Sequence, residues 1–178
     1  MNRTDSRGYT LVELLVVVTI LGLAGALVIP QMDQAGVLRS QAAMRTIIAD
    51  ITFAQADAVA MQEQRAIIFD PANNGYTVNE VLDATTFQPL VDLRSSSGTG
   101  EYRMTISRES YGNVQMTGAE FDGTDQMLVF DEFGAPVGAA GSNAPSAGGA
   151  ITLQDDFFDF TITLEPFTGR VIASKVER

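Results

Sequence analysis

A single carboxylate stands near the start of an apolar segment in this chain, and its position suggests chemistry. Glu13 follows Tyr9 by four residues and precedes the uncharged run 14–29. A carboxylate costs about 2.5–3.5 kcal/mol at the centre of a bilayer, and residues of this kind are usually functional. Two opposite charges about 4 Å apart attract by about 4 kcal/mol at an effective dielectric constant near 20. A cation beside Glu13 would therefore offset the cost of burying it.

Such a cation would arise from a cut after Gly8. Glycine has no side chain and can enter a narrow protease cleft in an extended conformation. The cut would leave an α-amine on Tyr9, one helical turn before Glu13 and on the same face. The residues alone leave two fates open for the carboxylate: pairing with the amine within one helix, or snorkelling to the membrane surface.

The composition excludes several classes of chemistry. The 178-residue chain contains no cysteine, histidine or tryptophan, which excludes disulfides, thiolate metal sites and catalysis by cysteine or histidine. No pair of nucleophile and base is visible in the sequence, and we predict neither enzyme activity nor a cofactor. The net charge of −11 and the pI of about 4.2 disfavour binding of nucleic acid, which requires a basic face.

Acidic clusters raise the question of calcium. They lie at 70–75, 122–125 and 155–159. The first resembles a calcium loop, but Ala72 offers no oxygen ligand at its third position. We interpret all three clusters as solvated surfaces, assign no metal ligand, and leave calcium binding open.

The N-terminal segment admits three interpretations. The uncharged run spans about 24 Å as a helix, and residues 9–13 extend it to about 31 Å, close to the thickness of a hydrocarbon core. Arg3 and Arg7 precede it, which predicts a cytoplasmic N-terminus. The segment could be a secretory signal peptide with an Ala-Gly-Ala cleavage site, a simple anchor, or a helix retained behind a leader cut at Gly8. Of the three, the last gives Glu13 a role.

The segment Gly8–Leu15 resembles the signature of type IV pilins and type II secretion pseudopilins. Tyr9 stands where that family usually has phenylalanine, a mild departure that retains the ring. Gly22 and Pro30 fall where the family's N-terminal helix commonly has glycine and proline. The resemblance implies a prepilin leader of residues 1–8 in front of a membrane helix.

The resemblance also implies a maturation step and an assembly. In that family a membrane aspartyl peptidase cleaves after the glycine, here Gly8, and methylates the new N-terminus, here Tyr9. Glu13 of an incoming subunit then meets the amine of its neighbour and sets the axial register, with Gly22 and Pro30 in the assembling helix. The implied partners are other pseudopilins or pilins, the prepilin peptidase, an inner-membrane assembly platform and membrane lipid.

The implied function is that of a minor pseudopilin. Such a protein is a structural subunit of a type II secretion pseudopilus, which serves protein export across the outer membrane. The chain would cross the inner membrane once and place its C-terminal domain in the periplasm. Two alternatives stay open: a minor pilin of a type IV pilus, active in assembly or DNA uptake, and an exported binding domain released by signal peptidase.

The residues beyond Pro30 predict an amphipathic helix that continues to residue 64. Pro30 itself should kink or interrupt the helix. One apolar stripe recurs at three- and four-residue steps: Val37, Met44, Ile47, Ile48, Ile51, Ala54, Ala58 and Met61. We assign the charged residues, Asp50 among them, to the rest of the cylinder, and we expect the stripe to pack along a globular domain.

From Arg65 onward, short β runs separated by turns predict an antiparallel β domain, with a hairpin turn at 70–75. Runs are expected at 66–69, 76–78, 90–93, 102–106, 114–116, 127–131, 151–153, 158–164 and 170–176. The predicted fold is α+β and pilin-like: a long N-terminal helix, membrane-spanning in its first half, packed on a C-terminal antiparallel β-sheet domain. The predicted divisions are a leader (1–8), a transmembrane and assembly helix (9–30), an amphipathic helix (31–64) and the β domain (65–178).

The β domain more loosely resembles H-type minor pseudopilins and their fimbrial T-type relatives, through the Phe-x-x-Gly turn at 130–134 and a Gly-Arg hairpin near the C-terminus. Some fimbrial relatives bind DNA through a basic tail. Here that tail would consist of Arg170, Lys175 and Arg178, but the second arginine of their motif is absent. Residues 134–149, rich in glycine, alanine and serine, predict a mobile surface loop.

Overall fold

A computed structural model of the chain describes residues 9–92, 100–123 and 125–177, except for the side chains of residues 26–35. The predicted leader, including Gly8, therefore lies outside the described residues. The same is true of Arg178 and of the side chain of Pro30.

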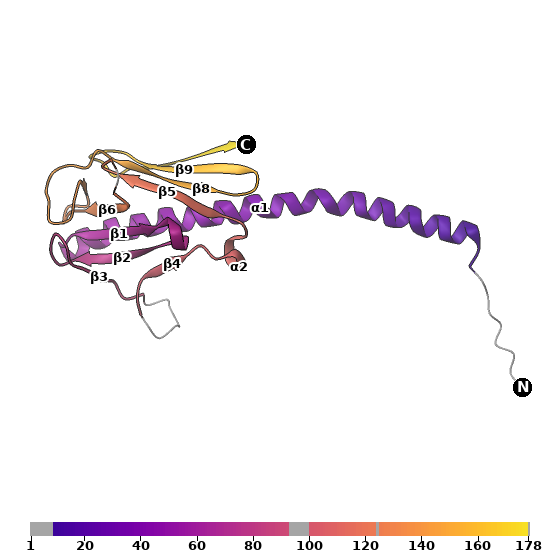
Figure 1. Cartoon of the computed structure of the whole chain (residues 1–178), viewed down its shortest axis with the longest axis horizontal. Coiled ribbons are helices and arrows are strands. Elements are labelled where there is room, and N and C mark those ends of the chain that lie inside the picture. The colour runs from indigo at the N-terminus through magenta and orange to yellow at the C-terminus, as the bar shows by residue number, and fades with distance from the viewer. Residues whose placement is uncertain (1–8, 93–99, 124, 178) are drawn as a thin grey trace, which may run out of the picture. The chain divides into compact units, whose positions relative to one another are not determined.

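The chain divides into two compact units, one ending at Leu38 and the other beginning at Arg39. Each contains part of helix α1 (Leu11–Met61), which is coloured indigo to purple in Figure 1. The helix is not interrupted at Pro30, which was one of the two outcomes that the sequence predicted. A proline removes one backbone donor, and the rest of the hydrogen-bond ladder can continue on either side of it.

Helix α1 ends at Met61 rather than at residue 64, because Gln62 adopts a left-handed conformation with φ of 57°. The junction between the helix and the first strand is held by the buried side chain of Arg65. Arg65 is 3% exposed, its Nε lies 2.6 Å from Oδ2 of Asp57, and its Nη1 lies 3.2 Å from Oε2 of Glu63. These ion pairs hold the last turns of the helix against the start of the first strand.

Ten strands follow in the described part of the chain, all in antiparallel pairs (Figure 1). They are β1 (Arg65–Asp70), β2 (Gly75–Val81), β3 (Phe87–Pro89), β4 (Arg103–Thr105), β5 (Gln115–Phe121), β6 (Met127–Phe130), β7 (Pro136–Val137), β8 (Gly149–Gln154), β9 (Phe158–Leu164) and β10 (Val171–Glu177). One sheet has the order β3-β2-β1-β6-β7, with β4 also paired to β2, and the other has the order β10-β9-β8-β5. The predicted α+β class is confirmed.

The hairpin between β1 and β2 forms as predicted, around the short 3-10 helix η1 (Pro71–Asn73). Asp70 accepts hydrogen bonds from the side-chain amide of Asn73 (2.6 Å) and from its backbone amide (3.1 Å). These bonds lower the pKa of Asp70 below its ordinary value. The strand expected at 90–93 is wrong in its described part, residues 90–92, since β3 lies earlier and Val91 makes an isolated bridge with Glu101, and residue 93 lies outside the described residues. The short helix α2 (Arg108–Tyr111) was not predicted.

The apolar stripe of α1 packs into one core with residues of both sheets, as predicted. Of the predicted stripe, Ile47, Ile51, Ala54 and Ala58 are buried, and Met44 and Ile48 are partly buried against the same core. Ala43, which the predicted stripe did not include, is buried with them. The strands contribute Ile67, Phe69, Val78 and Leu128 from one sheet and Met116, Ile151, Leu153, Phe160 and Ile162 from the other. Met61 is 59% exposed and departs from the prediction, because the helix ends at this residue.

Asp50 lies within this buried stripe, and the prediction that it faces away from the core is wrong. Its side chain is 3% exposed. The hydroxyl of Tyr76 in β2 donates to Oδ2 (2.7 Å), and the hydroxyl of Tyr102, just before β4, donates to Oδ1 (2.8 Å). Tyr102 also stacks on Phe53 of α1, with ring centroids 5.2 Å apart. A buried carboxylate needs such donors, and they tie the helix to the first sheet.

Residues 134–149 form a loop at the surface, as predicted, that is interrupted by the short strand β7, but part of the loop packs on the domain in a second apolar cluster. Its buried members are Ala66, Val129, Val137 and Ala140. The side-chain amide of Gln64 holds the segment with both its donor and its acceptor. Its Nε2 donates to the carbonyl of Ser142 (3.0 Å), and its Oε1 accepts from the backbone amide of Gly141 (2.7 Å). Few large apolar residues are needed here, because small side chains fill the space beside the sheet.

The substitution Asp50→Ala tests the link between helix and sheet. It leaves two buried tyrosine hydroxyls without their charged acceptor, and we expect it to lower the free energy of unfolding by about 3 kcal/mol. Urea unfolding followed by tyrosine fluorescence measures this change. Asp125→Ala removes an exposed carboxylate and should stay within about 0.5 kcal/mol of the wild type. A similarly small effect of Asp50→Ala would contradict the account.

A pH dependence follows from the same contact. Burial first, and then the charge of Asp50 and the hydrogen bond to it, raise the pKa of Tyr76 far above its ordinary value. The unfolded chain releases this proton near pH 10 and the folded chain keeps it, so stability is complete below pH 10 and falls above it. We expect a loss of about 1.4 kcal/mol per pH unit in urea unfolding, and the variant Tyr76→Phe should lose less.

Candidate assembly segment

The N-terminal segment begins with a capped helix. The hydroxyl of Thr10 accepts a hydrogen bond from the amide of Glu13 (3.2 Å), and the carbonyl of Thr10 accepts one from Leu14 (3.2 Å). This places Glu13 in the first turn, where the helix dipole favours a negative charge. Tyr9 precedes the helix and is 84% exposed. Sequence reasoning missed the role of Thr10, although the Thr-x-x-Glu spacing is a known capping signal.

The first turns of α1 present apolar side chains on every face. These residues are between 47% and 82% exposed: Leu11, Val12, Leu14, Leu15, Val16, Val17, Val18, Ile20, Leu21 and Leu23. Thr19 satisfies its hydroxyl within the helix by donating to the carbonyl of Leu15 (2.8 Å). A Cβ added to Gly22 would meet no atom within 4 Å, so packing inside the described chain does not require glycine there.

Across the residues that the structure describes, no helix combines the length and apolar character needed to span a membrane.

The basic residues of the tail do not converge. Arg170 is exposed in the turn before β10. Lys175 lies on β10 with its Nζ 3.3 Å from the ring centroid of Phe158, an arrangement typical of a cation–π contact. The two residues are separated by five positions in a nearly extended segment, which is about 17 Å and places them on opposite faces. Among the described residues, this tail therefore offers no common basic surface.

The acidic clusters are occupied by donors of the protein itself. Asp122 accepts hydrogen bonds from the hydroxyl of Ser146 (2.7 Å) and the amide of Ala147 (2.6 Å). Asp155 accepts from the hydroxyl of Ser40 and from the amide of Phe158 (2.7 Å). No group of three acidic side chains that could hold a metal ion occurs in the described part of the chain. These carboxylates join loops to strands and to α1.

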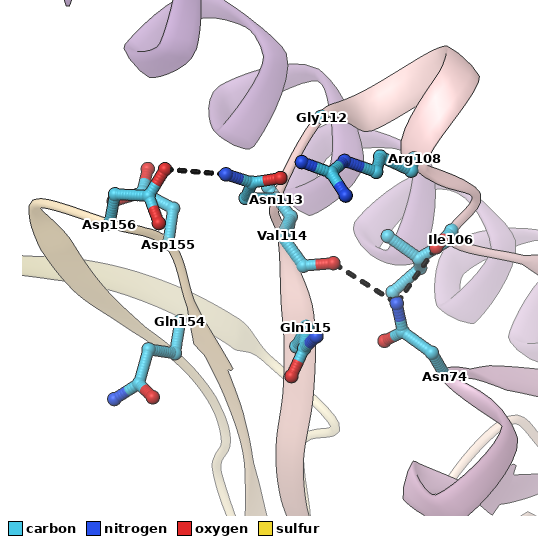
Figure 2. Close-up of a pocket in the computed structure, with 10 residues that line it drawn as sticks. All are labelled: Asn74, Ile106, Arg108, Gly112, Asn113, Val114, Gln115, Gln154, Asp155 and Asp156. Carbon is cyan, nitrogen blue, oxygen red and sulfur yellow. Dashed lines mark hydrogen bonds between the residues drawn. The ribbon is translucent and has the colours of Figure 1, made fainter.

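A polar cavity of about 420 Å³ lies between α2, the start of β5 and the turn after β8 (Figure 2). Asn74 crosses one side of it: its Nδ2 donates to the carbonyls of Ile106 (2.7 Å) and Val114 (3.0 Å). On the other side Asn113 donates to Asp156 (2.7 Å), as Figure 2 shows. The amide groups are used to join segments of the domain, and the lining residues include no pair of nucleophile and base.

Comparison with known proteins agrees with the N-terminal motif and with the fold. Residues 3–29 match the family described as the prokaryotic N-terminal methylation motif. The structure is similar to that of the minor pseudopilin EpsH from the Type 2 Secretion System of Vibrio cholerae, with a TM-score of 0.55. This chain has the fold of a minor pseudopilin. The match covers 76% of this chain and 96% of EpsH at 9% identity, and no curated protein matches the sequence.

The predicted resemblance to type IV pilin-like minor pseudopilins is thus confirmed in the N-terminal motif and in the pilin-like fold. The roles of Gly8, Tyr9, Glu13, Gly22 and Pro30 stay predictions. Tyr9 directly precedes α1 and Glu13 lies in its first turn, while Gly22 lies further along the same exposed apolar segment.

Proposed function

We propose that this protein is a minor pseudopilin, a non-enzymatic structural subunit of a type II secretion pseudopilus that serves protein export across the outer membrane. The observation that supports this most directly is Glu13 in the first turn of a helix whose apolar side chains are exposed all round. A helix of this kind needs an apolar environment on every side. Lipid can supply this environment before assembly, and the N-terminal helices of neighbouring subunits can supply it in a filament.

The proposed pathway begins in the inner membrane. The leader 1–8 stays in the cytoplasm and the prepilin peptidase cleaves after Gly8 and methylates Tyr9. Segment 9–30 remains as the transmembrane and assembly helix, 31–64 continues it, and the β domain 65–178 lies in the periplasm. The assembly platform of the inner membrane then moves the chain into the pseudopilus, where its partners are other pseudopilins.

The proposed register of assembly depends on Glu13. The new α-amine of Tyr9 belongs to the neighbouring subunit, and its attraction to the carboxylate is comparable in size with the cost of burying that carboxylate. A subunit that is one residue out of place would leave both charges unpaired in an apolar environment. Gly22 permits close approach of a neighbouring helix, because it adds no side chain to the exposed surface.

Sequencing of the mature N-terminus tests the pathway. We expect the protein isolated from its host to begin with methylated Tyr9, and the variant Gly8→Leu to retain its leader because the side chain blocks the cleavage site. Mass spectrometry of the isolated chain measures both outcomes. A mature chain that begins near Leu27 would instead indicate signal peptidase and release of the domain, and it would contradict the proposal.

The variant Glu13→Ala tests the register. It should be cleaved normally and keep its β domain folded, but enter the filament about tenfold less than the wild type, because the amine loses its paired carboxylate. Quantitative blotting of sheared or purified filaments measures incorporation. Glu109→Ala, which removes an exposed carboxylate from α2, is the matched control and should assemble normally. Wild-type incorporation of Glu13→Ala would remove the register argument.

Deletion of the gene separates this proposal from a minor pilin of a type IV pilus. A strain that loses protein export and keeps its surface pili supports the pseudopilus. A strain that loses pili or DNA uptake and keeps export supports the other assignment.

A further inference from the structure

Two phenylalanines lie exposed on tight turns of the β domain. Phe133 is 80% exposed between β6 and β7, and Phe167 is 70% exposed between β9 and β10. Val59 of α1 is 48% exposed and lies beside the first turn, since a Cβ added to Gly134 would come within 2.9 Å of its Cγ2. We call Val59, Phe133 and Phe167 the phenylalanine surface.

Both turns rest on the same residue of α1. The side-chain amide of Gln55 donates to the carbonyl of Gly134 (2.7 Å). A Cβ added to Gly169 would lie 3.0 Å from Nε2 of Gln55, so the second turn approaches it as closely as glycine allows. Gly134 and Gly169 are buried, whereas Phe133 and Phe167 are exposed. The two turns that carry Phe133 and Phe167 therefore lie beside the same residue of the helix.

The turn that carries Phe133 is held in one conformation. Oδ1 of Asp131 accepts hydrogen bonds from the amides of Phe133 (3.0 Å) and Ala135 (2.7 Å). The amide of Gly134 donates to the carbonyl of Asp131 (2.9 Å). A ring on such a turn adds no hydrophobic stabilisation to the fold while its apolar area stays in water. A preorganised aromatic side chain does, however, lose little entropy when a partner covers it.

The backbone of Phe167 is strained. Its φ of 61° lies in the left-handed region, which a bulky side chain rarely adopts and which asparagine or glycine adopts more readily. The ring is exposed, so its burial within the domain does not compensate for this strain. Strain at an exposed side chain indicates that the residue serves a purpose other than folding.

The charges beside the phenylalanine surface are mainly acidic. The two turns contain Asp131, Glu132 and Glu165 against one cation, Arg170, and the whole chain has a net charge of −11. A second copy would bring like charges together, and an anionic lipid surface would repel this face. Charge complementarity therefore selects a protein whose apolar pocket is bordered by lysine or arginine.

We propose that the phenylalanine surface docks a different protein subunit with an apolar pocket bordered by lysine or arginine, and neither a second copy of this chain nor lipid. This inference rests on the proposed function, because a pseudopilus places subunits of other sequence beside this one. Phe133 and Phe167 are the anchors, since exposed aromatic residues on ordered backbone are frequent hot spots of interfaces. Glu132 and Glu165 steer the partner.

Photo-crosslinking in the host cells tests the docking. The full chain carries p-benzoylphenylalanine in place of Phe133 or of Phe167. We expect both positions to react with the same other protein, at sites on its surface that have lysine or arginine beside them. Leu82, 53% exposed after β2, is the matched control position and should not yield this product. Combining Glu132→Lys with Glu165→Lys should lower the cross-link yield from position 133 about tenfold.

The variant Phe167→Asn separates docking from stability. Asparagine tolerates the left-handed backbone, so the purified full chain should melt no lower than the wild type. The yield of cross-links from position 133 should nevertheless fall about tenfold. A lower melting temperature would overturn the proposal, because it would give Phe167 a role in folding.

Cross-links to copies of this chain, to lipid or to no partner would also overturn the proposal. Those results are distinguishable from a failure of the proposed function, which would appear in the same cells as a mature chain that does not begin at Tyr9.

Discussion

The buried carboxylate of Asp50 fixes how α1 meets the strands. An apolar stripe of alanine and isoleucine can shift along a sheet and keep much of its contact area, but a buried charge is satisfied only where its donors are. The hydroxyls of Tyr76 and Tyr102 supply those donors from two segments of the first sheet. The contact therefore specifies one register of helix against sheet, while the apolar core around it supplies most of the attraction.

One helix meets two different requirements along its length. From Leu11 to Leu23 apolar side chains are exposed on every face, with Glu13 and Thr19 as the polar exceptions, whereas between Ala43 and Ala58 a single stripe is buried by the strands. The first pattern suits a segment that other molecules cover, and the second suits a segment that belongs to a globular core. The β domain thus has its own core, and it does not need the N-terminal segment to complete that core.

Local periodicity was enough to predict the α+β class, the hairpin after β1 and the buried stripe of α1. Asp50 could have been placed as well, since it lies three residues after Ile47 and four before Ala54. The second apolar cluster could not, because the alanines and glycines of 134–149 gain their burial from distant strands. In the N-terminal segment, sequence spacing identified Glu13 and the structure added the cap. No pattern in the sequence indicated the exposure of Phe133 and Phe167, which depends on how their turns meet α1.

The continuity of α1 also has a mechanical consequence. Any tension on the N-terminal segment passes along the helix backbone directly into the centre of the β domain. There the load is shared by the contacts of Asp50, by the ion pair of Arg65 with Asp57 and by the buried stripe. A subunit built in this way transmits force through its core, and its strands are not loaded one at a time at the edge of a sheet.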